Sequence, residues 1–372
     1  MTQGSNRLRT HFLLISILVV LAGLFTVRSH SPAPLSSDYS MAARAANQSM
    51  RAIVAHEKGG PEVLKLHQNY PRPVPKAGEV LIRVKAFGLN RAEMFTRQGH
   101  SPGVVFPRIL GIEATGIVEE APSNEFVKGQ TVVTAMGNMG RMYDGGYAEY
   151  TCVNATQVKP IQSTTVPWNV LGALPETMQT AWGSLFGPLK LQSGDRLLIR
   201  GGTTTIGLAA AALAKHHGAH VVSTSRKPER ETMLRDHGAD HVIIDSGSIA
   251  NEVLAQYPEG VDKVLELIGV VTMADSLKTL KPGGIQCMTG IAGGKWVLDS
   301  FSPLPTIPKG RYLTTYGGSS DDLLATPLDD IVKLFEDGTM ILPIKTFSME
   351  EIVEAHRFME FEGGAKAVVL VD

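Results

Sequence analysis

The sequence predicts an α/β protein in which a doubly wound parallel sheet of six strands is joined to a small β-rich domain. Six runs rich in Val, Ile and Leu recur between residues 197 and 316, and helix-forming segments separate them. Strands that alternate with crossover helices form parallel sheets with helices on both faces. Residues 50–166 hold short strands with Pro and Gly between them, which is typical of a partly open barrel. The predicted strands of the parallel sheet are residues 197–200, 220–224, 242–244, 263–267, 285–289 and 312–316.

The stretch from residue 195 to residue 230 contains a strand, a glycine turn, an alanine-rich helix and a second strand. The turn reads Gly202-x-Thr204-x-x-Gly207, a dinucleotide fingerprint with threonine in place of the middle glycine. A helix that begins at such a turn directs its free N–H groups at a pyrophosphate, and the last glycine lets helix and strand pack closely. We therefore expect a dinucleotide site here rather than a purely structural turn. Its predicted residues are Gly202, Thr204, Thr205, Ile206 and Gly207.

The end of the second strand indicates which dinucleotide binds. NAD sites usually place an acid about twenty residues past the glycines, where it accepts hydrogen bonds from the ribose 2′-OH. Here Ser225, Arg226 and Arg230 occupy that region, and no acid precedes Glu229. Hydroxyls and guanidinium groups suit a 2′-phosphate, because charge-assisted bonds from Arg to phosphate are strong. We predict NADP(H) as the cofactor, with a solvated basic loop as the alternative.

Composition limits the classes of partner. The chain has 372 residues and a formal net charge of −1, with charges of both signs interspersed. Because there is no basic stripe, nucleic acid is not an expected partner, and a small-molecule substrate is. Only Cys152 and Cys287 are present, too few for a disulfide framework.

Residues 1–49 form an N-terminal extension of a different character. The uncharged apolar segment 12–27 follows two arginines, and a stretch rich in Ser, Pro and Ala comes after it. The segment is slightly short for a spanning helix and long for a signal-peptide core. We expect a membrane anchor or a cleaved targeting segment, including an organelle transit peptide. If translation starts at Met50, the protein is expected in the cytoplasm.

The end of the chain returns to mixed structure, with an apolar run over residues 367–371 that is expected to complete the first domain. The predicted domains are therefore discontinuous. Residues 50–166 and 320–372 form the barrel domain, and residues 167–319 form the nucleotide-binding domain.

Several motifs in this order resemble the medium-chain dehydrogenase/reductase superfamily, and more narrowly its zinc-free quinone oxidoreductase (zeta-crystallin-like) branch. The resemblance runs from Met50 to Asp372 and implies a GroES-like catalytic domain, a Rossmann domain and a homodimer. The residues that carry it, besides the glycine turn, are 50–54 (M-R-A-I-V), 59–64 (G-G-P-E-V-L), 88–93 (G-L-N-R-A-E), 107–116 (P-R-I-L-G-I-E-A-T-G) and 145–149 (G-G-Y-A-E).

The resemblance also bears on metal binding. Zinc-bearing relatives have Cys, His and Cys at the places of Asn90, Ile112 and Glu176, where this chain offers an amide, an aliphatic side chain and one carboxylate. A catalytic zinc needs three protein ligands, and a structural one needs four. Two cysteines in the whole chain also exclude a four-thiolate lobe. We therefore predict no metal site, with Glu113 as a buried structural acid.

Without a Lewis acid, the expected substrates are quinones and α,β-unsaturated carbonyls, whose conjugation spreads the incoming charge. The resemblance implies that Asn90 donates a hydrogen bond to the developing oxyanion, although an asparagine after a strand also suits a simple turn. Several quinone reductases have Tyr where this chain has Phe95, so the proton is expected from water or from Tyr147, unless Tyr147 faces the core. The resemblance places these further residues beside the cofactor: Thr180, Ile268, Gly269, Thr289 and Gly290.

Two alternative functions stay open. One is an enoyl reductase that serves a single pathway of secondary metabolism. The other is a membrane-attached nucleotide-binding protein with little catalytic activity, held through residues 12–27.

Overall fold

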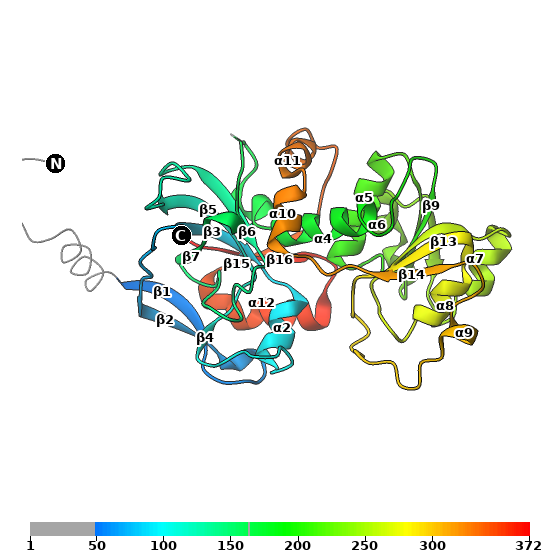
Figure 1. Cartoon of the computed structure of the whole chain (residues 1–372), viewed down its shortest axis with the longest axis horizontal. Coiled ribbons are helices and arrows are strands. Elements are labelled where there is room, and N and C mark those ends of the chain that lie inside the picture. Colours follow the sequence, from blue (N-terminus) through cyan, green and yellow to red (C-terminus); the bar gives the residue numbers. More distant parts are fainter. Residues whose placement is uncertain (1–48, 163) are drawn as a thin grey trace, which may run out of the picture. The chain divides into compact units, whose positions relative to one another are not determined.

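The computed structural model of the protein describes residues 49–162 and 164–372 (Figure 1). The predicted apolar segment 12–27 lies outside these residues. Within the described ranges, no helix is both long enough and apolar enough to span a membrane.

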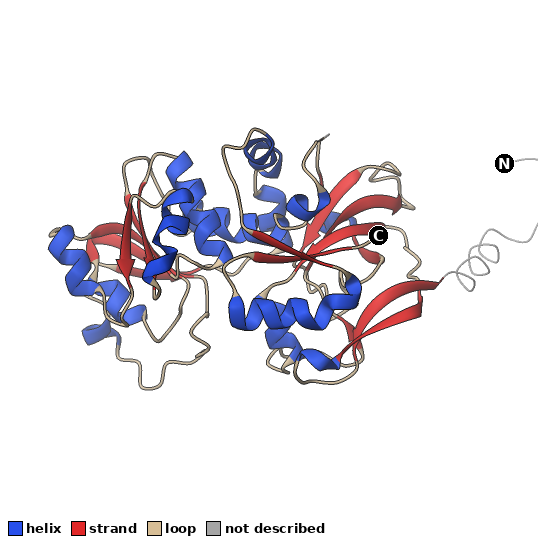
Figure 2. Ribbon diagram, turned by 180° about the vertical axis from the view of Figure 1, so that it is seen from behind, coloured by secondary structure: helices blue, strands red, loops and turns tan. Residues whose placement is uncertain are grey.

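The parallel sheet has six strands in the order β11-β10-β9-β12-β13-β14, and every neighbouring pair is parallel. This is the order 3-2-1-4-5-6 of a Rossmann fold, so the predicted fold class is confirmed. Its helices lie on both sides of the sheet (Figure 2). The strands are β9 (Arg196–Arg200), β10 (His220–Ser225), β11 (His241–Ile244), β12 (Val261–Glu266), β13 (Leu280–Met288) and β14 (Tyr312–Thr315). The helices that connect them are α5 (Thr205–His216), α6 (Glu231–Asp236), α7 (Ala250–Gln256), α8 (Met273–Lys278) and α9 (Pro303–Thr306).

All six predicted strands are present, but β13 starts five residues before the predicted start at residue 285. The stretch 281–284 (K-P-G-G), whose composition is typical of a turn, lies inside this strand. The pairing of β13 with β12 shifts its register between Val261 and Lys263. An irregularity of this kind accommodates proline and a glycine of positive φ without ending the strand.

The barrel domain contains a seven-stranded and a three-stranded sheet. The larger sheet runs β15-β16-β3-β5-β6-β8, with β7 also paired to β3, and the smaller runs β2-β1-β4. Strand β16, near the end of the chain, pairs antiparallel with β3. The strands are β1 (Ser49–Ala55), β2 (Leu64–Pro71), β3 (Glu79–Gly88), β4 (Arg108–Ile109), β5 (Glu113–Glu120), β6 (Thr131–Ala135), β7 (Tyr150–Asn154), β8 (Val158–Pro160), β15 (Ile344–Phe347) and β16 (Lys366–Leu370).

Residues 168–186 form two helices rather than one continuous helix. Helix α3 (Trp168–Leu171) ends at Gly172, and α4 (Pro175–Phe186) begins anew with Pro175 as its first residue. Proline lacks the N–H that would continue the hydrogen bonding of a helix, so it begins a helix more readily than it continues one. The remaining helices are α2 (Arg91–Arg97), α10 (Ser320–Ala325), α11 (Leu328–Glu336) and α12 (Ile352–Arg357), which continues as a π-helical turn (Phe358–Glu362). Short 3₁₀ turns lie at Pro61–Val63, Ala155–Gln157, Pro228–Arg230 and Met349–Glu351.

Candidate cofactor and substrate site

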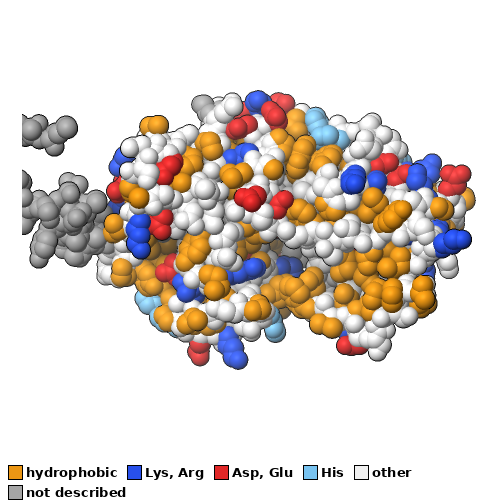
Figure 3. Space-filling model, in the orientation of Figure 1, with side chains coloured by type: hydrophobic (Ala, Val, Ile, Leu, Met, Phe, Trp, Pro, Cys, Tyr) orange, Lys and Arg blue, Asp and Glu red, His pale blue; other side chains and the backbone are white. Residues whose placement is uncertain are grey.

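A cavity of about 980 Å³ lies between the barrel domain and the parallel sheet. Its walls come from the carboxyl ends of β9 to β13, from α2 and α4, and from the stretch between α12 and β16. The space-filling view shows a recess near the middle of one face, bordered by hydrophobic side chains (Figure 3). Ligands of doubly wound sheets bind in this place, outside the carboxyl ends of the strands.

The glycine turn borders this cavity. Gly201 has a φ of +91°, which a residue with a Cβ rarely adopts. A Cβ at Gly207 would lie 2.6 Å from the carbonyl oxygen of Gly201 and 2.7 Å from that of Gly202. Gly207 is therefore the position where helix α5 approaches the turn most closely, as the fingerprint requires.

Thr204 forms the N-cap of α5. Its hydroxyl donates to the oxygen of Gly201 at 2.8 Å and accepts from the N–H of Gly207 at 3.0 Å. The hydroxyl therefore stabilises the turn, and its hydrogen is already engaged within it. The N–H groups of Thr205 and Ile206 belong to the first helical turn, which lacks intrahelical partners, and both residues line the cavity. This cradle fits a pyrophosphate group.

Ser225, Arg226 and Arg230 lie together at one end of the cavity. Within residues 49–162 and 164–372, the guanidinium of Arg226 has no hydrogen-bond or ion-pair partner, and the residue is exposed. Arg230 makes only a long bond, 3.5 Å, to the oxygen of Glu362. Two cations at this end are therefore largely free to meet an anion.

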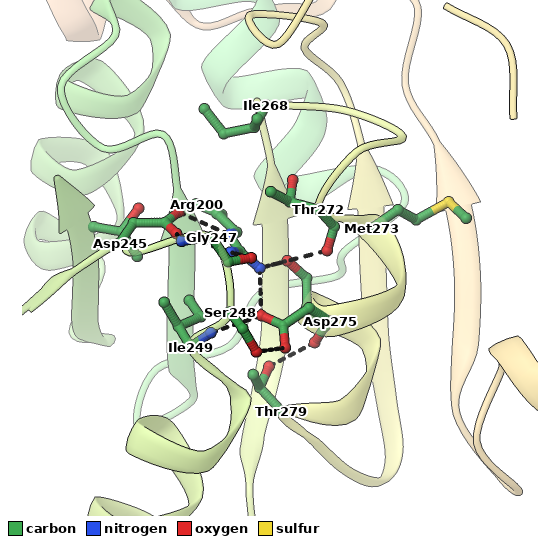
Figure 4. Close-up of polar contacts among 12 residues, drawn as sticks. Arg200, Asp245, Gly247, Ser248, Ile249, Ile268, Thr272, Met273, Asp275 and Thr279 are labelled. Carbon is green, nitrogen blue, oxygen red and sulfur yellow. Dashed lines mark hydrogen bonds and ion pairs between the residues drawn. The ribbon is translucent and has the colours of Figure 1, made fainter. Parts of the chain in front are cut away.

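The acid at the same end of the cavity is already paired. Asp245 follows β11 and accepts two bonds of 2.9 Å from the guanidinium of Arg200, which is completely buried (Figure 4). The same guanidinium donates to Asp275 at 2.7 Å. Both carboxylate oxygens of Asp245 therefore already accept hydrogen bonds from Arg200.

The residues predicted around the nicotinamide also lie at the cavity. Thr180, Ile268, Thr289 and Gly290 line it, whereas Gly202, Gly207 and Gly269 shape the backbone behind the wall. A Cβ at Gly290 would lie 2.5 Å from the oxygen of Leu267, so a close backbone approach explains this glycine. Gly269 has a φ of +109°, a backbone conformation that favours glycine at this position.

Asn90 also lines the cavity, within a buried polar cluster. Its Nδ2 donates to Glu113 at 2.9 Å, and its Oδ1 accepts from Lys366 Nζ at 2.5 Å. Lys366 Nζ lies 2.9 Å from Glu113 and 3.8 Å from Glu176. Burial opposes the charge of Lys366, but the carboxylates of Glu113 and Glu176 outweigh it and raise the pKa of the ammonium. Burial raises the pKa of Glu176.

Tyr147 lies elsewhere. Its side chain is completely buried in the barrel core, stacked on Phe87 with ring centroids 4.6 Å apart. Its hydroxyl contacts His356 Nε2 at 3.2 Å, and the residue does not line the cavity. The sequence left two alternatives for Tyr147: a proton donor to the substrate or a side chain of the core. The position of Tyr147 matches the core side chain, because its hydroxyl does not reach the cavity.

The donor set around Lys366 does not suit a catalytic zinc ion. Asn90, Ile112 and Glu176 stand where zinc-bearing relatives have their ligands, and an ammonium group lies among the acidic side chains instead. Glu113 Oε1 already accepts from both Asn90 and Lys366. Residues 49–162 and 164–372 hold no group of three His, Cys, Asp or Glu side chains that could bind a metal.

Lys366 and Trp296 escaped the sequence analysis as parts of the site. Lys366 is 276 residues from Asn90 along the chain, so no local motif joins them. Trp296 comes from the loop after β13, and its ring contacts Phe95 of α2 edge to face at 4.8 Å. An exposed tryptophan in a loop was the only available signal.

Sequence and structure comparisons agree with this arrangement. Residues 76–163 match the family model of the alcohol dehydrogenase GroES-like domain, and residues 205–327 match that of the zinc-binding dehydrogenases. Quinone oxidoreductase of Mus musculus is 30% identical over 253 residues, which cover 66% of this chain and 74% of the mouse protein. NADPH-dependent alkenal/one oxidoreductase of Arabidopsis thaliana is 26% identical over 330 residues, covering 86% and 79%. A mycobacterial protein solved in complex with NADPH superposes with a TM-score of 0.77 at 25% identity, covering 87% and 100%.

The fold and the cavity define an oxidoreductase that uses a nicotinamide cofactor. The similar proteins identify its family. The chain belongs to the medium-chain dehydrogenase/reductase superfamily, in the quinone oxidoreductase branch.

Proposed function

We propose that this protein is an NADPH-dependent, zinc-independent reductase of quinones or α,β-unsaturated carbonyl compounds. The observation that carries the proposal is that two different groups of polar residues line one cavity. The largely unpaired guanidinium groups of Arg226 and Arg230 line this cavity, and so does a buried Asn–Lys–Glu cluster that does not suit zinc.

The preference for NADPH follows from charge. Arg226 and Arg230 are available to a 2′-phosphate, and Asp245, an acid that also lines the cavity, is bound to Arg200. An NAD site would need a free carboxylate for the ribose 2′-OH. The mycobacterial structure with bound NADPH supports the same cofactor.

The substrate class follows from the polar cluster around Asn90. A bound reduced nicotinamide supplies a hydride, and the protein orients the acceptor and stabilises the charge that develops on its oxygen. Asn90 offers an amide N–H there, and no metal is needed for a conjugated acceptor. The names of the mouse and Arabidopsis relatives, a quinone and an alkenal/one oxidoreductase, support this class.

The test is an acceptor panel. Full-length protein is assayed for NADPH oxidation with simple quinones, short enones, saturated aldehydes and enoyl thioesters. We expect turnover of quinones or enones and none of saturated aldehydes. Turnover of enoyl thioesters alone would select the pathway-specific enoyl reductase, and tight NADPH binding without turnover would select the binding protein.

Two aromatic side chains that line the cavity, Phe95 and Trp296, predict an apolar acceptor. Phe95 and Trp296 pack edge to face at the cavity, and such pairs contribute about 0.5–1.5 kcal/mol. Trp296→Ala is therefore expected to raise KM for an apolar quinone about two- to tenfold with kcat nearly unchanged, because it removes uniform binding. Val297→Ala, at the next position and outside the cavity, is the control. An unchanged KM in Trp296→Ala would remove this wall from the acceptor site.

A homodimer is expected from the family resemblance, and the sheet offers a surface for it. Strand β14 is at the edge of the six-stranded sheet within the described residues, and its Tyr312 is 60% exposed. Pairing of two edge strands would satisfy their free backbone groups. Light scattering coupled to size exclusion measures the state directly.

A further inference from the structure

Lys366 is the first residue of β16, and it is 3% exposed although its side chain carries a charge. A buried ammonium group is expensive unless it is paired and hydrogen-bonded. Two of its partners, Asn90 and Glu176, line the cavity with it, and Glu113 lies behind them. The charge therefore lies at the acceptor end of the site.

The hydrogen bonds of Asn90 determine the orientation of its side-chain amide. Lys366 can only donate, so the atom that it contacts at 2.5 Å is the carbonyl oxygen of the amide. Glu113 accepts, so the atom 2.9 Å from it is the amide nitrogen. The backbone of Asn90 is held as well, because its N–H donates to Glu93 in the capping box of α2.

One amide hydrogen of Asn90 is left over. The nitrogen carries two, and Glu113 takes one, so the second is available to a ligand. With the amide reversed, Asn90 would present its oxygen instead, which would repel an oxyanion.

We propose that Lys366 is a positioning residue for the reaction: it locks the amide of Asn90 so that its free N–H meets the acceptor oxygen, and its positive charge lies behind that amide. This inference rests on the proposed function. When hydride adds to the conjugated acceptor, the π electrons move to the carbonyl oxygen, and a proton from water later neutralises it. Lys366 supports that oxygen through Asn90 in a site whose donor set does not suit zinc.

The variant that tests this removes the buried cation together with the carboxylate closest to it. Lys366→Met alone would leave Glu113 as an unpaired buried carboxylate and endanger folding. The double variant Lys366→Met/Glu113→Gln removes the charges of this closest pair, and the oxygen of the new amide can accept either from Asn90 or from the N–H of Glu176. Lys345→Met on the neighbouring strand β15, where the lysine side chain is 48% exposed, is the matched control.

Two readouts are taken on full-length protein. The first is steady-state reduction of a quinone, where we expect kcat of the double variant to fall about tenfold or more, with an unchanged dissociation constant for NADPH. The second uses 4-nitrophenol, whose phenolate is coloured and mimics the oxyanion, bound in the presence of NADP⁺. Wild type is expected to lower the pKa of the bound phenol, and the double variant to lose about one unit of that shift, a tenfold change.

Asn90→Ala should lose the same shift as the double variant, and Lys345→Met should keep it. A double variant with wild-type kcat and wild-type phenol pKa would overturn the proposal, as would wild-type protein that does not lower the pKa of the phenol. If wild type lowers that pKa and the double variant does not, while no quinone or enone turns over, the proposed function fails and the role of Lys366 stands.

Discussion

Replacing Gly207 by valine is expected to abolish cofactor binding and to destabilise the parallel-sheet domain. A Cβ at this position would lie 2.6 Å and 2.7 Å from two backbone oxygens of the turn, which cannot move without opening it. Overpacking of this kind costs about 1–3 kcal/mol in rigid surroundings. Displacement of α5 would also move the N–H groups of Thr205 and Ile206 away from the pyrophosphate.

Thermal unfolding and titration of NADPH and NADH by fluorescence measure the two effects. Both cofactors should bind at least tenfold more weakly, because the pyrophosphate is common to them. Gly317→Val is the control, since a Cβ there meets nothing within 4 Å and its φ is not in the left-handed region. Wild-type binding by Gly207→Val would mean that the turn does not hold the cofactor.

Replacing Arg226 by alanine is expected to weaken NADPH by about 1–3 kcal/mol, the range for a hydrogen bond to a charged group. NADH should bind as before, because it has no 2′-phosphate. Lys227→Ala is the matched control, a neighbouring cation that does not line the cavity. The measurement is the pair of dissociation constants for each variant, and an equal loss for both cofactors would refute the 2′-phosphate site.

The parallel sheet could be predicted because its evidence is local. Each strand is a short run of branched residues, and Gly207 and Arg226 lie within one βαβ unit. The boundaries of helices and strands could not be predicted where a single residue or a local irregularity outweighed the hydrophobic pattern. Pro175 divides a continuous helical segment into α3 and α4, and a register shift carries β13 through a stretch that reads as a turn.

The acceptor end of the site could be predicted only in part. The resemblance pointed to Asn90, but the lysine that orients it comes from the last strand of the chain, and only the pairing of β16 with β3 brings them together. Tyr147 illustrates the opposite case. Its residue type suits proton transfer, yet its place in a strand-rich segment buries it against Phe87 and His356.

Metal dependence of turnover tests the central claim most directly. The rate of NADPH oxidation by a quinone is measured on full-length protein before and after exhaustive chelation, with zinc content determined on the same sample. An unchanged rate at negligible zinc content is the predicted result, because Lys366 and Asn90 occupy the acceptor end of the cavity. A rate that is lost on chelation and restored by one equivalent of zinc would contradict the account.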